Sequence, residues 1–467
     1  MRRNVGRVLG LSLLLASGTA IGTGWAQPRT LQDALAATYS NNPTLQAARA
    51  QLRATDEGVP QALAGGRPTV VLAGGAGYGA GSFGSTANNV FTERRNNREV
   101  YTEQATLTQP LYRGGATRAG TNQADNRVFA QRGRLLASEQ QVFNDTVNAF
   151  VNVIQTQQVL QLNINNEQVL ARQLQATNDR FRVGEITRTD VAQAEAALAG
   201  ARATRQTAEG NLQSARATYR RLVGELPDQL VEPQPVRLPI RTSVEAAQLA
   251  AANNPNVVAA LFDNAASKDA IDVAFSALMP QLSVQAQGAR SDGASLAGQR
   301  TTGATVLLNA SVPLYQGGAE YSRVRQARQT EQQTRKTVDD VRRQVIAQAT
   351  QAWETLQATR ATIESTRVQI RANQIALEGV QREAIVGSRT TLDVLNAEQT
   401  LLNSRVTLVQ NLSNLIINSY TVAAAIGRLT ARDLNLNVPL YDETAYYQAV
   451  KNKLFGTGDY ATNQPGR

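Results

Sequence analysis

The sequence QPLYRGGA occupies residues 109–116, and VPLYQGGA occupies residues 312–319. From the proline onward the two stretches differ only at Arg113 and Gln316. They start 203 residues apart, and a match of this kind within one chain indicates an internal repeat. The repeat predicts that the chain has two halves with the same architecture.

Further short matches follow the same order in both halves. The sequence NNP occurs at 41–43 and again at 253–255, which is an offset of 212 residues. Asp190 and Asp393 are offset by 203 residues, like the PLY stretches. The offset therefore changes by nine residues (212 − 203) in the segment before the PLY stretch, so the first half carries an insertion there. This ordered set of matches indicates gene duplication.

The composition excludes several kinds of chemistry. The 467 residues include no cysteine and no histidine, which excludes thiol nucleophiles, disulfides and Cys/His zinc sites. No nucleophile–base pair, phosphate loop or metal cluster is recognisable, so we expect no enzyme activity, no cofactor and no bound metal. We interpret the formal charge of +10 as arginine spread over solvated faces.

Residues 1–26 have the pattern of a secretory signal peptide. Arginines precede an apolar stretch at 8–21, and Gly24 and Ala26 place small residues at the −3 and −1 positions of a cleavage site. We expect the mature chain to start at Gln27, and export argues against a nucleic-acid partner. The remaining chain has no apolar run near about 18 residues, so we expect no transmembrane helix.

We expect each half to contain a helix of about thirty residues, a β-hairpin and a long pair of helices. The domain boundaries predicted from the sequence are a signal peptide at 1–26, a first repeat at 27–227, a linker at 228–241, a second repeat at 242–430 and a C-terminal segment at 431–467. Within the repeats, the hairpins are predicted at 69–111 and 281–313, and the helical pairs at 116–224 and 319–427.

The long helices are predicted from proline-free stretches rich in Ala, Gln, Arg, Leu and Glu. Residues 116–182 and 319–385 would each form a helix of about 100 Å, which must pack along its length. The helix after each turn has a seven-residue period in which many companion positions are small or polar, namely Ala194, Ala201, Ala208 and Ala215, and then Ala397, Ser404, Asn411 and Asn418. Such a thin seam suits the wall of a tube. An ordinary antiparallel coiled-coil bundle is the alternative.

Alternating apolar and polar residues predict strands at 69–79, 100–111, 282–290 and 304–312, joined by polar loops at 82–98 and 291–301. Strands of about ten residues with one apolar face are what a membrane β-barrel needs. A soluble hairpin packed on the helices is the alternative. Four strands cannot close a barrel alone, so the sequence predicts that two or more chains share one.

The chain resembles the TolC family of outer-membrane efflux and secretion channels over about residues 28–455. The resemblance is carried by the PLYxGG pair, the NNP pair, and the turns RFRVGEITRTDVAQAEAAL (180–198) and REAIVGSRTTLDVLNAEQTLL (382–402). It implies an α+β membrane protein that forms a homotrimer in the outer membrane of a Gram-negative bacterium. Three chains would make a twelve-strand β-barrel and a twelve-helix periplasmic α-barrel of long antiparallel coiled coils. The inter-repeat segment and a C-terminal helix near 442–454 would form an equatorial girdle.

The resemblance also assigns roles at the periplasmic end. Asp393 matches an acidic ring that constricts the pore, whereas Asn396 stands where the next ring is usually acidic. Three copies of Asp393 in a narrow ring would attract cations and raise one another's pKa. Helix N-capping is the alternative role for Asp190 and Asp393, since both follow a turn.

Other roles follow from the same resemblance. Thr189, Asp190 and Arg389 match contacts that hold the closed state, and Ala384 replaces a tyrosine of a second latch. The turns expected to contact an adaptor contain Gly184, Glu185, Ile186, Gly387 and Ser388. The bends expected between strand and helix contain Pro110, Gly114, Gly115, Pro313, Gly317 and Gly318.

The resemblance therefore implies a passive exit duct of a tripartite efflux pump or a type I secretion system, gated at its helical tips. Its expected partners are two further copies of the chain, a periplasmic adaptor protein, an inner-membrane pump of the RND, ABC or MFS type, and outer-membrane lipid. A poreless structural coiled-coil protein of the periplasm or cell surface is the alternative.

Overall fold

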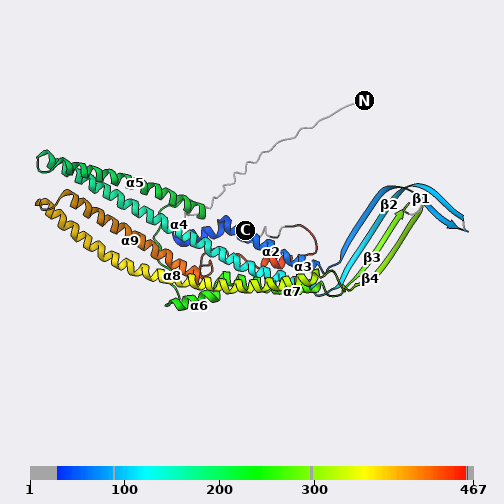
Figure 1. Ribbon diagram of the computed structural model, residues 1–467. Coiled ribbons are helices and arrows are strands. Elements are labelled where there is room, and N and C mark those ends of the chain that lie inside the picture. Colours follow the sequence, from blue (N-terminus) through cyan, green and yellow to red (C-terminus); the bar gives the residue numbers. More distant parts are fainter. Residues whose placement is uncertain (1–28, 88–89, 295–297, 459, 461–467) are drawn as a thin grey trace, which may run out of the picture.

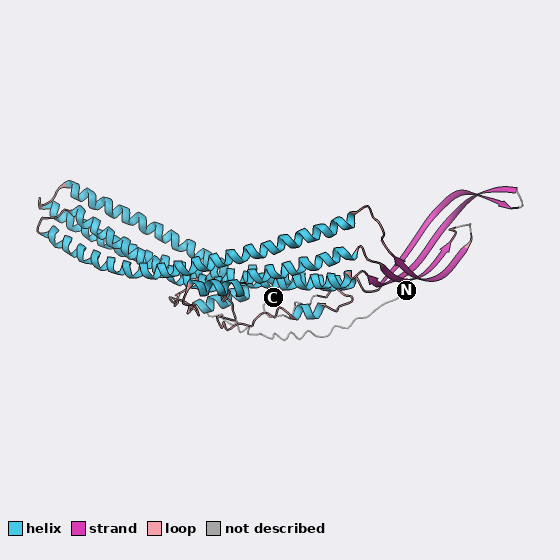
Figure 2. Ribbon diagram, turned by 60° about the horizontal axis from the view of Figure 1, so that its bottom comes forward, coloured by secondary structure: helices cyan, strands magenta, loops and turns pink. Residues whose placement is uncertain are grey.

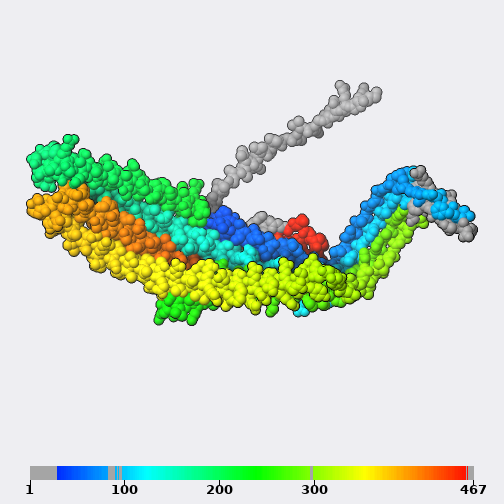
Figure 3. Space-filling view, viewed as in Figure 1, coloured from blue at the N-terminus to red at the C-terminus, as the bar shows by residue number. Residues whose placement is uncertain are grey.

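The computed structural model describes residues 29–87, 90–294, 298–458 and 460. The predicted signal peptide at 1–26 lies outside the described residues. The protein is a long, bowed body of helices joined by a narrow neck to a curved sheet (Figures 1 and 3).

The two halves have the same order of elements, except that a single helix of the second half, α7, stands where the first half has α2 and α3. The first half comprises α1 (Leu31–Asn41), α2 (Pro43–Asp56), α3 (Gly58–Ala64), β1 (Thr69–Ala87), β2 (Val90–Arg113), α4 (Ala116–Arg182) and α5 (Arg188–Val223). The second half comprises α6 (Ser243–Asn253), α7 (Pro255–Ser276), β3 (Gln281–Asp292), β4 (Arg300–Ser311), α8 (Ala319–Ile385) and α9 (Thr391–Ala425), followed by α10 (Ala445–Val450). The long helices α4 and α8 have the bounds expected from the sequence.

The single helix expected at the start of each half is wrong, because the NNP sequence interrupts it. Asn42 has an extended backbone and caps α2, whose first residue is Pro43. Its Nδ2 also donates to the Leu222 carbonyl at the end of α5 (3.0 Å). In the second half, Asn254 Nδ2 donates to the Ala425 carbonyl at the end of α9 (3.1 Å). Each NNP asparagine therefore ends one helix, starts the next and ties the break to the end of a coiled-coil helix.

The helices of the body run side by side along its length (Figures 1 and 2). In the half away from the sheet these are α4 with α5, and α8 with α9. In the half near the sheet, α2 and α3 pack on α4, and α7 packs on both α4 and α8. The largest buried core lies where these two arrangements meet, and it joins α1, α2, α4, α5 and α9 to the C-terminal segment.

The heptad seam of α5 is buried as predicted. Its buried residues are Ala194, Leu198, Ala201, Ala208, Leu212, Ala215, Tyr219 and Leu222. Arg205, which breaks the apolar period, forms ion pairs with Glu167 of α4 (2.9 Å) and Glu209 (3.1 Å).

The seam between α8 and α9 contains a ladder of side-chain hydrogen bonds. Asn418 donates to Thr359 (3.0 Å), Asn411 donates to Thr366 (3.2 Å), and Asn373 donates to Ser404 (2.8 Å). These pairs recur every seven residues because both helices follow the heptad. The polar companion side chains of α9 are thus hydrogen-bonded to α8, and these bonds fix the register of the two helices.

The sheet is antiparallel with strand order β1-β2-β3-β4. The polar loop expected at 82–98 is wrong, because β1 and β2 continue pairing to Ala87 opposite Val90. An antiparallel ladder pairs backbone groups whatever the side chains, so a glycine-rich polar sequence did not end it. The connection between β3 and β4 lies within the expected 291–301, since β3 ends at Asp292 and β4 begins at Arg300.

Asp56 is a buried acid in the main core of the first half. Its side chain is 0% exposed, and neither carboxylate oxygen has a hydrogen-bond partner. Burial raises the pKa of Asp56 to about 7, although Arg132 and Arg53 lower it. Glu57 and Glu443 raise it further. The pKa of Asp56 is therefore higher in the folded protein than the value near 3.8 expected in the unfolded chain. Between these two pH values the folded protein binds more protons than the unfolded chain, so the free energy of unfolding falls as the pH rises from about 3.8 to about 7.

We expect Asp56→Asn to stabilise the protein above the folded pKa, because the variant has no buried carboxylate to ionise. The gain should be about 1 to 3 kcal/mol at pH 8 and should shrink toward pH 5. Thermal unfolding of the detergent-solubilised protein, followed by circular dichroism at both pH values, measures this difference. Asp272→Asn, at an exposed position of α7, is the matched control. An equal gain in stability at both pH values would show that ionisation of the buried Asp56 carboxyl is not its cause.

Candidate functional site

The end of the helical body away from the sheet is closed by two tight turns (Figure 1). The first joins α4 to α5. Gly184 has φ +81° and donates to the Phe181 carbonyl (3.0 Å), while Glu185 donates to the Arg180 carbonyl (3.0 Å). These two bonds form a Schellman motif, which requires a left-handed residue and therefore favours glycine. Thr187 then caps α5.

The second turn, between α8 and α9, repeats this geometry. Gly387 has φ +83° and donates to the Ala384 carbonyl (3.3 Å), and Ser388 donates to the Glu383 carbonyl (3.0 Å). Thr390 caps α9. Both turns therefore have the same backbone at equivalent positions of the repeat.

Asp190 and Asp393 belong to capping boxes in this structure. Thr390 donates from its backbone N (3.0 Å) and its Oγ1 (2.9 Å) to Asp393 Oδ2, and Asp393 N donates back to Thr390 Oγ1 (3.2 Å). Asp190 forms the same set with Thr187. The N-cap residues are thus the threonines, and the aspartates lie three positions later. The expectation that the aspartates are themselves the N-caps is wrong.

Hydrogen bonds from the Thr390 backbone and side chain, with the Arg389 guanidinium nearby, lower the pKa of Asp393. The carboxylate is therefore charged at neutral pH within one chain. Mutual elevation of the pKa by three neighbouring copies stays a prediction, since it concerns the assembly. Asn396 lies one helical turn beyond Asp393 and is exposed.

Each turn carries an ion pair, and the helix residues of the two pairs occupy equivalent positions with opposite charge. In the first turn, Arg180 of α4 pairs with Glu185 (2.5 Å). In the second, Glu383 of α8 pairs with Arg389 (2.9 Å). Arg180 and Glu383 are 203 residues apart and thus occupy the same place in the repeat. Sequence analysis missed both helix residues, although the spacing of opposite charges across each glycine turn was a usable signal.

The candidate latch residues are not in contact within one chain. Across the two turns, all of whose residues the structure describes, no hydrogen bond or ion pair joins Thr189 or Asp190 to Arg389. The two helical pairs meet instead through a small apolar cluster next to the turns, made of Leu170, Leu198, Ala201 and Leu395. A contact of Arg389 with Asp190 therefore requires a neighbouring chain or a different tip arrangement.

Glu398 of α9 is another residue that sequence analysis missed. It accepts a hydrogen bond from Gln381 of α8 (3.1 Å), and partial burial raises the pKa of its carboxyl. It lies one turn beyond Val394 on the side that faces α8, so it links the two helices behind the tip.

The junctions between strands and helices contain the PLYxGG motifs. Gly115 and Gly318 have φ +89° and +82° and immediately precede α4 and α8. Gly114 approaches the connection between α7 and β3 closely, since a Cβ there would lie 2.5 Å from the Met279 side chain. The glycines therefore lie where the chain changes direction between strand and helix.

Pro110 differs from expectation, whereas Pro313 lies in the expected connection between strand and helix. Pro110 lies inside β2, at a register shift between Pro110 and Tyr112, and is not part of the bend. Because proline has no backbone N–H, it fits such an irregularity. Pro313 follows β4 and precedes the glycines by several residues.

One face of the sheet is apolar near the helical body. Residues opposite one another on paired strands share a face, and alternate residues along a strand share it too. The apolar rows are Val70–Leu107–Ala286–Val306 and Leu72–Ala105–Gly288–Ala304, continued on β3 and β4 by Val284–Leu308 and Leu282–Ala310. The next rows on this face, farther from the body, bring together Glu103 with Arg290, and Asp292 with Arg300 (2.8 Å). The apolar area is therefore a band with a charged outer boundary.

The other face of the same segment is mostly polar. Its rows are Thr69–Thr108–Gln285–Leu307 and Val71–Thr106–Gln287–Thr305. Asn309 donates to Gln285 (3.2 Å), and Gln104 donates to Thr106 (3.0 Å). One face thus suits lipid and the other suits water.

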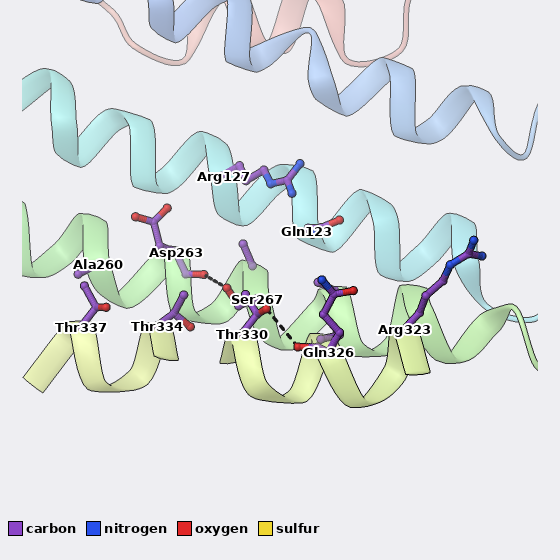
Figure 4. Close-up of a pocket in the computed structure, with 13 residues that line it drawn as sticks. Gln123, Arg127, Ala260, Asp263, Ser267, Arg323, Gln326, Thr330, Thr334 and Thr337 are labelled. Carbon is purple, nitrogen blue, oxygen red and sulfur yellow. Dashed lines mark hydrogen bonds between the residues drawn. The ribbon is translucent and has the colours of Figure 1, made fainter. Parts of the chain in front are cut away.

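A groove of about 510 Å³ lies between α4, α7 and α8 on the helical body (Figure 4). Small and hydroxyl side chains line much of it, including Ser267, Thr330, Thr334 and Thr337. Asp263 at its edge pairs with Arg134 of α4. The lining offers no group of acidic residues that could hold a metal ion, and none was found elsewhere among the described residues.

Among the described residues, no helix is both long enough and apolar enough to cross a membrane.

A sheet with one apolar and one polar face, carried on a long body of coiled-coil helices, is typical of a membrane channel protein. The chain belongs to the outer membrane efflux protein family, whose model matches residues 34–225 and 246–428. The two matched stretches correspond to the two halves of the repeat.

Known relatives extend over nearly the whole chain. The outer membrane efflux protein BepC of Brucella suis biovar 1 (strain 1330) is 34% identical over 446 residues, which cover 95% of each chain. The outer membrane protein TolC of Escherichia coli (strain K12) is 26% identical, covering 84% of this chain and 81% of TolC. The crystal structure of the outer membrane protein VceC of Vibrio cholerae has the same fold, with a TM-score of 0.73 and 20% identity over 85% of this chain and 96% of VceC.

The protein is therefore an outer-membrane channel for efflux or secretion in a Gram-negative bacterium, and its helical body lies in the periplasm. The family consists of channel proteins and not of enzymes. This membership favours the channel over a poreless coiled-coil protein.

We expect Gly387→Ala to loosen the second turn, since an alanine at φ +83° costs about 1 to 2 kcal/mol. Amide exchange of the peptide covering 383–393, followed by mass spectrometry, should become several-fold faster. Gly200→Ala inside α5 is the control, because a Cβ there meets no atom and an interior helical alanine is favourable. Unchanged exchange in Gly387→Ala, or equal acceleration in both variants, would contradict this role of the turn.

Proposed function

We propose that three copies of the chain form one continuous duct, with a twelve-strand barrel in the outer membrane and a twelve-helix tunnel across the periplasm. The observation that carries this proposal is the four-stranded sheet, whose edge strands β1 and β4 are unpaired in the single chain. Unpaired backbone groups are too costly in lipid, so neighbouring copies must pair β1 with β4.

The helical body supports the same stoichiometry. Four helices lie side by side in each chain, so three copies supply twelve at most heights of the tunnel. The apolar rows around Leu107 and Val306 face lipid in this assembly, and the rows around Gln285 and Thr106 face the lumen. The small residues along the groove between α7 and α8 allow a neighbouring helix to approach closely.

We further propose that the two turns form the periplasmic gate. Asp393 would form an acidic ring from three chains, and Asn396 would form a neutral ring one turn above it. Because the capping box keeps Asp393 ionised within each chain, the ring favours cations when the copies approach. Thr189, Asp190 and Arg389 would hold the closed arrangement between neighbouring helical pairs.

The partners proposed for this duct act at the same end. A periplasmic adaptor would contact the turns around Gly184, Glu185, Ile186, Gly387 and Ser388. An inner-membrane pump of the RND, ABC or MFS type would supply the transport energy, since nothing in a passive duct can do so. The duct serves either a tripartite efflux pump or a type I secretion system.

We expect Asp393→Ala to change conduction through the ring, because it removes three carboxylates from the narrowest segment. In planar bilayers the purified trimer should lose most of its cation selectivity, and its single-channel conductance should rise about two-fold or more. Thr390→Val is the matched control, since it breaks the same capping box and keeps the charge. Equal effects of both variants would assign the change to the cap and not to the charge.

We expect Arg389→Gln to open the tip, because it removes the positive partner of the proposed latch. Conductance of the purified trimer should rise several-fold. Glu383→Gln breaks the same ion pair within the turn but leaves Arg389 in place, so it should leave the channel closed. Opening by Glu383→Gln to the same extent would show that the pair within the turn, and not the latch, holds the closed state.

A further inference from the structure

The segment that follows α10 lies at the neck of the molecule. Arg67, two residues before β1, donates from Nη1 to the Lys453 carbonyl (2.8 Å). Lys453 N donates to the Val450 carbonyl at the end of α10 (3.0 Å). In Figure 3 the red C-terminal residues lie beside α2 and α3, next to the base of the sheet. Residues 451–455 are therefore held level with the first residues of β1.

Two large apolar side chains project from this segment. Leu454 is 73% exposed and Phe455 is 88% exposed. By contrast, Val450, at the end of α10, is buried against the helical body. Adjacent exposed leucine and phenylalanine side chains at a fixed position are unfavourable in water and indicate a surface that is covered in the working protein.

The same segment carries positive charge and aromatic rings. Lys451 and Lys453 are two of the four lysines in the whole sequence. Lys453 Nζ lies 4.0 Å from the centre of the Tyr460 ring, and Lys451 Nζ lies 5.1 Å from that of Tyr447. Lysine and tyrosine beside leucine and phenylalanine are the combination found at the boundary between lipid tails and headgroups.

We propose that residues 451–455 form a lipid-binding anchor at the periplasmic surface of the outer membrane. Leu454 and Phe455 enter the acyl chains of the inner leaflet, and Lys451 and Lys453 bind the phosphates of phospholipid headgroups. The anchor fixes the neck to the membrane outside the sheet. This inference rests on the proposed placement of the sheet in lipid.

The position of the segment favours lipid over a neighbouring chain as the occupant. The apolar rows of the sheet begin at Val70, three residues after the Arg67 that holds Lys453. The hydrogen bond from Arg67 to Lys453 therefore places the exposed pair near the start of the apolar band. Protein interfaces are depleted of lysine at their centres, whereas anionic lipid surfaces attract it.

Tryptophan fluorescence in lipid tests the proposal directly. The sequence has two tryptophans, namely Trp25 in the expected signal peptide and Trp353, which is buried in α8. We would introduce Phe455→Trp, with Leu72→Trp in the apolar rows and Ile385→Trp at the tip as controls, because all three positions are exposed. Each full-length trimer is reconstituted in nanodiscs of phosphatidylcholine brominated near the headgroup end of its chains, mixed with phosphatidylglycerol.

We expect the bromolipid to lower the emission of Phe455→Trp about two-fold relative to unbrominated lipid, as for a residue in the interface. Leu72→Trp should be quenched as well, and Ile385→Trp should not. Quenching at Leu72 without quenching at Phe455 would overturn the anchor while leaving the sheet in the membrane. Absence of quenching at both positions would overturn the anchor together with the placement of the sheet. A blue-shifted but unquenched Phe455→Trp would identify a neighbouring chain as the cover.

The lysines are tested in the same system. Adding Lys451→Gln and Lys453→Gln to Phe455→Trp should reduce quenching in discs that contain phosphatidylglycerol, and it should have less effect at high salt. Lys336→Gln, which removes an exposed lysine of α8, is the matched control. Equal quenching with and without the two lysines would remove the headgroup contact from the proposal.

Discussion

Backbone hydrogen bonding at the edges of the sheet is the constraint on which the rest of this structure depends. A strand in lipid has no water to satisfy its N–H and C=O groups, so β1 and β4 must each find a partner strand. In the proposed assembly, copies of the chain close a barrel and their helices are brought together below it. The helical body must then be a wall with neighbours on two sides, which explains seams of alanine, serine and asparagine where a globular core would have larger apolar residues.

The same requirement shapes the helical pairs. A wall one helix thick has no large apolar core. Other interactions must therefore fix the register of the two helices in each pair. In the second half these interactions are the ladder that joins Asn418, Asn411 and Ser404 to α8. In the first half, Arg205 performs a similar role through Glu167. Polar pairs inside each seam thus fix the register of the two helices that each turn connects.

The turns themselves combine a rigid backbone with variable side chains. Each has a Schellman glycine and a capping box, so the backbone is the same at Gly184 and Gly387. The ion pairs are reversed between them, with arginine on α4 and glutamate on α8. A duplicated hairpin has thus kept its geometry while its two tips present different charge patterns to whatever docks on them.

The sequence by itself determined the repeat, the bounds of α4 and α8, the heptad seam of α5 and the alternation in β3 and β4. These features are local or periodic, so residue spacing is enough to predict them. The TolC resemblance, carried by motifs at the turns and junctions, also indicated the family.

Only the tertiary structure decided the remaining points. The side chain of Asn42 ties the break between α1 and α2 to the end of α5, 180 residues away. The β1–β2 pairing extends through a polar, glycine-rich stretch because a ladder is stabilised by the partner strand and not by its own side chains. The contact between Arg67 and Lys453 joins residues 386 positions apart, and no periodicity encodes it. Contacts between distant segments depend on how the helices pack, and this is why the sequence predicted the elements but not the places where they meet.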